Sequence, residues 1–346
     1  MQPIHTLSDL LQQSQVDYQI FDLGRRVQEI DAQQFIAVEQ GRQPYPYPLQ
    51  RHAHLAIVYW NQQQQPWIWF VKFALDERGL LAQAEVGQFL NYVLEAMGSR
   101  LTGELSEQQQ QKLANNPYTY QPKEDKMAVI HSRIRRQLSL PCSQYYEHAQ
   151  HYLSGDMGWN NWQTVGLQGI SDICARLDQV DNHDLIINAL PYLPSSVLYA
   201  LLGMLEHVTL PTAIAQALQQ RLQDCYQTKE IDLFLVAALI RALSGSEPEP
   251  LAQVIETLLA EPCLCHPEVL IAIAGRCWSA LQSTHRAQLF LLRLAQTGDQ
   301  TLFNQLFADL VMLPELRVIF LPLLHSSPCP ELTQALIHLQ QTTRSV

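Results

Sequence analysis

With 346 residues, the chain is long enough for two domains, because single hydrophobic cores usually stop growing at about 250–300 residues. Hydrophobic residues make up 47% of the chain and charged residues 16%, a composition that excludes a disordered protein. Residues 1–141 hold 13 Lys or Arg and 14 Asp or Glu, whereas residues 142–346 hold 9 and 19. The resulting charge of −10 on the second segment disfavours general binding of nucleic acid.

Segments that would direct the chain into or across a membrane are missing from the sequence. Met1 to Asp17 has no basic leader and no long apolar run. The longest apolar stretch, Leu233 to Ile240, is far shorter than the ~20 residues that a bilayer crossing requires. Seven scattered cysteines favour reduced thiols over a disulfide framework. We therefore expect a cytoplasmic protein with no membrane contact.

The first hundred residues alternate between helical and extended patterns. A short helix around Leu7–Leu11 precedes a strand at Tyr18–Leu23, and Asp31 can cap a following helix. The β-branched and aromatic runs Leu55–Trp60 and Trp67–Phe73, separated by five residues, predict an antiparallel hairpin. Apolar residues spaced by three and four from 80 to 97 predict a helix that packs on this hairpin. Residues 1–100 should therefore form a small α/β domain.

The next eighty residues are expected to connect the two parts of the chain. Residues 101–122 are predicted to be a linker or surface excursion that holds one short helix, because Ser106 and Gln109 form a capping-box pattern. Residues 123–180 should form bridging helices over Glu124–Leu138, Cys142–Leu153 and Trp159–Leu177.

A repeated apolar pattern dominates residues 181–346. Large or small apolar residues recur at offsets 0, 3, 4, 7 and 10 in segments that begin at Leu198, Leu233, Leu270, Phe303 and Leu332, although the last position of the final segment is polar. The starts are 35, 37, 33 and 29 residues apart, and further predicted helices lie between them. This periodicity predicts a stack of α-helical hairpins, a HEAT-like solenoid, so the protein as a whole should be mainly α.

Several segments are similar to those of a known family. These are Phe21–Arg26, Pro44–Trp60, Trp69–Leu81 and Leu113–Tyr120. Through them the chain resembles an uncharacterised gammaproteobacterial family, domain-of-unknown-function family 3549, over its full length. The resemblance implies no activity.

The sequence contains no Gly-rich phosphate loop, nucleophile elbow, zinc-protease helix or Cys-x-x-Cys pair. Cys263, Cys265 and His266 are the best candidates for a metal site, since thiolate and imidazole suit Zn²⁺. A structural zinc site requires a fourth ligand, and none lies nearby in sequence. We therefore expect ordinary turn packing at these residues, with no metal and no cofactor.

One predicted helix carries most of the basic residues. Arg133, Arg135 and Arg136 can bind phosphate groups, as in an RNA-associated factor. They can equally pair with the acidic part of the same chain, which is the interpretation we favour.

Three further residues are candidate contacts for a ligand or partner. His148 and His151 lie three apart and can share one helix face, as metal ligands or acid/base groups do, although a solvated face accounts for them equally. Trp159 follows a glycine-rich turn where a ligand pocket at the domain junction is an alternative to simple packing.

The leading functional hypothesis is a non-catalytic adaptor or scaffold that binds another protein along its helical repeats. The concentrated negative charge favours a partner with a basic surface. The alternative is an enzyme or small-ligand binder with a pocket at the domain junction, and an RNA-associated factor is the third hypothesis.

Overall fold

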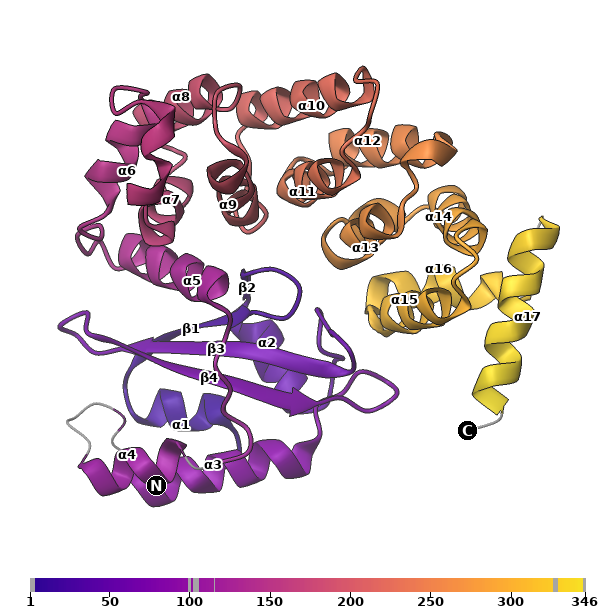
Figure 1. The fold of residues 1–346 in the computed structure, drawn as a ribbon. Helices are drawn as coiled ribbons and strands as arrows, with labels where there is room; N and C mark the ends of the chain where they lie inside the picture. The colour runs from indigo at the N-terminus through magenta and orange to yellow at the C-terminus, as the bar shows by residue number, and fades with distance from the viewer. Residues whose placement is uncertain (1–3, 99–100, 102–105, 115, 326–328, 345–346) are drawn as a thin grey trace. The chain divides into compact units, whose positions relative to one another are not determined.

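The computed structural model describes residues 4–98, 101, 106–114, 116–325 and 329–344. Its contacts divide the chain into a first unit of residues 1–123 with 312–314 and a second unit of residues 124–311 with 315–346 (Figure 1). The protein is mainly α, with a small antiparallel sheet near its N-terminus, as the sequence predicts. Among the described residues, no helix has the length and apolar character needed to cross a bilayer.

The first unit is built around a four-stranded antiparallel sheet in the order β2-β1-β3-β4. Its elements are α1 (Leu7–Gln13), β1 (Asp17–Asp22), β2 (Gln28–Ile30), α2 (Ala32–Glu39), β3 (His52–Trp60), β4 (Pro66–Ala74), α3 (Gln83–Met97) and α4 (Glu107–Ala114). The predicted hairpin is β3 and β4, which pair from His52–Ala74 to Trp60–Pro66. Ser106 caps α4 through Gln109 as predicted.

Helix α3 covers one face of the hairpin because its apolar residues meet the aromatic residues of β4. The ring of Phe89 contacts Trp69 and Phe73 edge-on, at centroid distances of 5.9 and 5.8 Å. Beyond α4, the backbone returns to β4, where Lys72 N donates to Tyr118 O and Tyr120 N donates to Phe70 O. This segment satisfies backbone groups that an edge strand would otherwise leave unpaired.

A buried carboxylate joins the two small helices of the first unit. Glu39, at the end of α2, accepts the backbone N–H groups of Leu7 and Ser8 at 3.0 Å each, and also the Ser8 hydroxyl. These are first-turn donors of α1 that have no partner inside the helix. Burial is the main cause that raises the pKa of Glu39 above its ordinary value of 4.5.

The described residues of the second unit form helices and the turns that connect them, with no strand. Its elements are α5 (Glu124–Gln137), α6 (Tyr146–Leu153), a 3₁₀ turn (Trp159–Thr164), α7 (Leu167–Cys174), α8 (Val180–Ala189), α9 (Ser195–Leu205), α10 (Thr212–Tyr226), α11 (Leu233–Leu243), α12 (Pro248–Ala260), α13 (Pro267–Arg276), α14 (Thr284–Gln296), α15 (Gln300–Met312), α16 (Pro314–Leu323) and α17 (Pro330–Arg344), with short 3₁₀ turns at Pro262–Leu264 and Trp278–Leu281.

These helices form two rows. Helices α7, α9, α11 and α13 pack side by side and make up what we call the central row, while α6, α8, α10, α12 and α14 make up the second row. Figure 1 shows that the unit curves, with the central row on the inside of its own curve. The repeated apolar pattern falls in α9, α11, α13, α15 and α17, and its residues are mostly buried.

The bridging region differs from its prediction at two helices. Helix α6 begins at Tyr146 and not at Cys142. The helix expected over Trp159–Leu177 is broken into a 3₁₀ turn and α7, because Val165 and Gly166 are extended. A second glycine then allows close packing of α7: a Cβ at Gly169 would lie 2.5 Å from the carbonyl oxygen of Tyr145.

Candidate functional site

Two of the three predicted arginines on α5 connect this helix to distant residues of the second unit. The guanidinium of Arg133 donates to the carbonyl oxygen of His207 at the end of α9. The guanidinium of Arg136 donates to the carbonyl oxygen of Ala175 at 2.6 Å and lies 3.1 Å from the Asp178 carboxylate. These contacts hold α5 against the residues that follow α7 and α9.

Arg135 has different surroundings. It donates to the backbone carbonyl of Pro141 at 2.9 Å and lines a polar pocket together with His131. Arg135 therefore bonds to a residue just beyond its own helix and also faces a pocket, whereas Arg133 and Arg136 reach distant parts of the unit.

The two predicted histidines on α6 lie on its exposed surface without sharing a partner. His148 is 3.0 Å from the hydroxyl of Thr164, and His151 is 3.7 Å from the carboxylate of Asp156. Trp159 contacts Tyr152 edge-on and stacks on Tyr192, each at a centroid distance of 5.7 Å. Each of the three residues thus makes a separate local contact.

The cysteine and histidine cluster forms the turn between α12 and α13. His266 accepts the N–H of Glu268 and so caps α13, while the Cys265 thiol points to the carbonyl oxygen of Leu258. Burial raises the pKa of the Cys265 thiol to about 11, and Cys263 is exposed. In the described residues, no group of three or more His, Cys, Asp or Glu side chains is placed to hold a metal ion.

The most distinctive surface of the second unit is a row of exposed apolar side chains. Tyr199, Phe234 and Ile271 each follow the first residue of the repeated pattern, in α9, α11 and α13 respectively. Their exposed fractions are 36%, 61% and 40%. Because these three helices pack side by side in the central row, equivalent positions lie next to one another. We call these three residues the apolar row.

Small residues lie one helical turn after each member of the apolar row. They are Gly203, Ala238 and Gly275. Among the described residues, no atom of a neighbouring element lies within 4 Å of a Cβ built on Gly203 or Gly275. The backbone of α9 and α13 is therefore open to close approach beside the apolar row, whereas Ala238 on α11 is buried.

A buried charge cluster ties together the C-terminal ends of the same three helices. Glu206, whose side chain is only 6% exposed, lies 2.8 Å from Arg276 and 3.5 Å from Arg241. Each arginine comes from a different helix of the central row, so the cluster fixes the spacing of α9, α11 and α13. Its two guanidinium groups share this one carboxylate.

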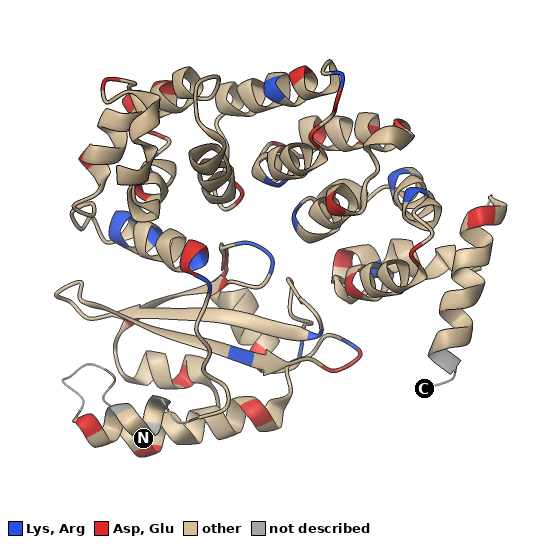
Figure 2. Cartoon of the chain, in the orientation of Figure 1, with Lys and Arg blue, Asp and Glu red and all other residues tan. Residues whose placement is uncertain are grey.

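The N-terminal ends of these helices carry carboxylates instead. Glu230 and Asp232 precede α11, and Glu268 lies in the first turn of α13. None of the three forms an ion pair with a Lys, Arg or His elsewhere in the described chain. Figure 2 shows that acidic residues are also common along the second row and its turns. One edge of the apolar row is therefore acidic.

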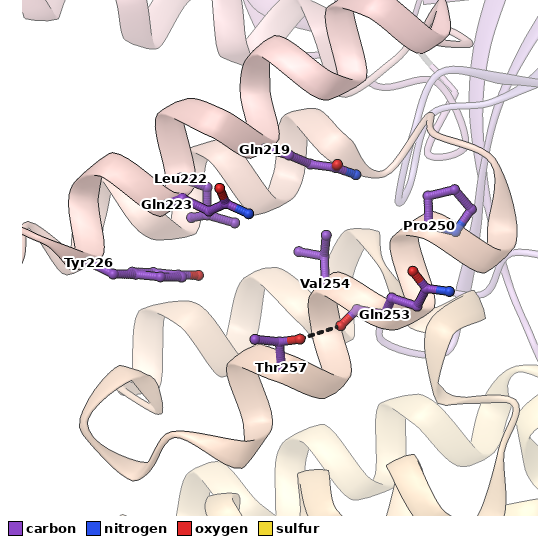
Figure 3. A pocket seen from close by; sticks show the side chains of 8 residues that line it. All are labelled: Gln219, Leu222, Gln223, Tyr226, Pro250, Gln253, Val254 and Thr257. Atoms are coloured by element: carbon purple, nitrogen blue, oxygen red, sulfur yellow. Dashed lines mark hydrogen bonds between the residues drawn. The ribbon is translucent and has the colours of Figure 1, made fainter.

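A groove lined by uncharged side chains lies between α10 and α12 (Figure 3). It has a volume of about 230 Å³, and its side chains include Gln219, Gln223, Gln253 and Tyr226. The hydroxyl of Thr257 donates to the carbonyl oxygen of Gln253 at 2.9 Å. Amide groups and a tyrosine ring can bind a polar chain, but they supply no charge.

The first unit holds a buried carboxylate that sequence reasoning did not single out. Asp22 accepts hydrogen bonds from the Tyr45 hydroxyl at 2.7 Å and from the backbone N–H groups of Gly24 and Arg25. Burial, followed by the charge of Asp22, raises the pKa of Tyr45. These bonds fix the turn after β1. The only sequence signal was the polar residue at the end of an apolar strand.

The apolar row was also missed, although its signal was present. Each of its residues sits at the same offset in successive repeats, where an amphipathic helix should carry a polar residue. The features described above define a mainly α protein whose best candidate site is a binding surface on packed helices.

The chain belongs to the family described as protein of unknown function (DUF3549), whose model matches residues 2–340. No curated protein and no solved structure shows significant similarity to it.

Proposed function

We propose that the protein is a non-catalytic adaptor that binds another protein through the apolar row of its second unit. The observation that carries this proposal is the recurrence of exposed Tyr199, Phe234 and Ile271 at one offset in three adjacent helices. Single exposed apolar residues are common on protein surfaces, whereas a contiguous set is typical of an interaction site.

Burial of the apolar row would supply part of the free energy of binding. Covering a large apolar side chain contributes about 1.5–3 kcal/mol, so the partly exposed row can contribute about 2–4 kcal/mol in total. Aromatic residues in such positions often dominate an interface. Phe234, the most exposed of the three, should therefore be the strongest contact.

The acidic edge supports a partner with a basic surface. Glu230, Asp232 and Glu268 lie beside the apolar row, whereas the arginines at its other edge are already held by Glu206. A segment with apolar residues flanked by Lys or Arg would match both features. Its association should weaken at high salt, because screening shortens the range of the attraction.

This proposal includes three features that accompany the adaptor role. Residues 181–346 would be a HEAT-like repeat, and the protein would act in the cytoplasm. The proposed domains are residues 1–100, a linker at 101–122, bridging helices at 123–180 and the repeat.

The test is affinity purification of the tagged full-length chain from its own cells, at low and at high salt. Phe234→Ser should lower recovery of a specific partner about tenfold or more, because hot-spot residues contribute at least about 2 kcal/mol. The matched control is Val318→Ser, which changes a 73% exposed side chain on α16 outside the apolar row. Circular dichroism of each variant verifies that the fold is kept.

Equal recovery with the Phe234 and Val318 variants would contradict the proposed surface. A partner that is acidic and retained at high salt would contradict the proposed chemistry of the partner.

A further inference from the structure

A pocket of about 370 Å³ lies between α5, α7 and the loop before α6. Its polar lining comes from three separate segments of the second unit. Those side chains are His131, Arg135, Ser143, Gln144, Tyr145 and Gln168. The pocket is independent of the apolar row, which lies on α9, α11 and α13.

The charge in this pocket is positive. Arg135 forms no ion pair within the described part of the chain, whereas its neighbour Arg136 is paired with Asp178. A guanidinium has five N–H groups, and the Pro141 carbonyl accepts one of those of Arg135. The guanidinium therefore retains donors for a ligand.

His131 lies one helical turn from Arg135 and lines the same pocket. His131 is exposed, but partial loss of its surrounding water, together with the charge of Arg135, lowers its pKa below 6.5. A negative ligand between the two residues would oppose both effects and would make the protonated imidazole a second cation.

The carboxylate next to the pocket does not cancel this charge. Asp172 is fully buried, and one of its oxygens accepts the N–H of Ser143 at 3.0 Å. The other is 3.4 Å from Arg176, which is also buried. Asp172 is thus neutralised by its own partner. The Ser143 hydroxyl keeps a hydrogen to donate, since it accepts the N–H of Tyr145.

We propose that this pocket binds the phosphate group of a small molecule. Arginine pairs with phosphate through parallel N–H donors, and a tetrahedral anion can accept further bonds from side chains around it. Ser143 and Gln144 provide such neutral donors from the loop, opposite the cations on α5. A carboxylate is planar and would use fewer of these groups.

Titration of the full-length protein with inorganic phosphate tests the site, observed by NMR at the imidazole of His131. The resonance is assigned by its loss in His131→Gln. Phosphate should shift this resonance saturably and raise the pKa of His131. Arg135→Gln should weaken phosphate binding about tenfold or more, since a charged hydrogen bond is lost. Arg136→Gln is the matched control, because it removes an equal charge one residue away and should change binding less than about twofold.

Three results would overturn the proposal. The first is a shift that does not saturate at millimolar phosphate. The second is equal weakening by Arg136→Gln, which would mean that only the general positive charge of α5 matters. The third is acetate binding as tight as phosphate binding, since the pocket would then take any small anion.

Discussion

Replacing Glu206 with alanine tests whether the buried charge cluster holds the central row together. The carboxylate is almost fully buried, and it joins Arg241 of α11 and Arg276 of α13 to the end of α9. Removing one member of a buried ion pair typically costs about 3–5 kcal/mol. The two arginines are 34% and 21% exposed, so water can still solvate them in part. We therefore expect a smaller loss of about 2–3 kcal/mol in the free energy of unfolding.

Thermal unfolding followed by circular dichroism measures this loss. For a unit of this size, 1 kcal/mol corresponds to about 2–4 °C, so Glu206→Ala should lower the melting temperature by about 5–10 °C. The matched control is Glu256→Ala. Glu256 pairs with Arg286 at 3.3 Å but is 47% exposed, so its loss should cost less than about 1 kcal/mol.

The reasoning would be refuted if both variants lowered the melting temperature equally. Glu206→Gln separates charge from packing, because it keeps the side-chain volume. A full recovery of stability in Glu206→Gln would show that the cavity, and not the charge, explains the effect of alanine.

Three other predictions concern single residues. The pKa of Glu39 is raised above 4.5 in the folded state, so unfolding releases a proton at a pH between 4.5 and the folded pKa. The stability that Glu39 contributes therefore falls as the pH rises through this range. Urea unfolding from pH 4.5 upward should show this slope in the wild type and not in Glu39→Gln. Iodoacetamide at pH 8 should label exposed Cys263 well before Cys265, whose pKa is about 11, and mass spectrometry of the digested protein would show equal labelling if this is wrong. Gly169→Ala should destabilise the protein by about 2 kcal/mol or more, because its Cβ would meet a carbonyl oxygen at 2.5 Å. Gly203→Ala should instead stabilise it by about 0.5–1 kcal/mol, since that Cβ meets open space; melting temperatures that move in the same direction would contradict the pair.

Much of the fold could be predicted from local patterns. The carboxylate of Asp31 accepts the N–H groups of Gln33 and Gln34 at the start of α2, as its capping role requires. The periodicity of the apolar residues also predicted helices of the central row, because one face of each helix must be buried. Strand β2 was not predicted, because its three residues give too short a pattern. Gly166 gave only a weak signal for the break before α7, since glycine also occurs inside helices.

The candidate sites depend on contacts that sequence spacing does not encode. Arg276 and Glu206 are 70 residues apart, and Arg133 reaches the backbone of His207 across 74. Composition indicated only that basic and acidic residues were both present. The packing of the helices decides which arginine forms an ion pair and which one, such as Arg135, faces a pocket.

The side-by-side contacts of the central row hold the apolar row in one arrangement before any partner binds. Helix α11 packs against both α9 and α13, and Glu206 connects the ends of the same three helices. Tyr199, Phe234 and Ile271 are therefore presented from a rigid support. A surface that is ordered in advance loses little conformational freedom when a partner covers it.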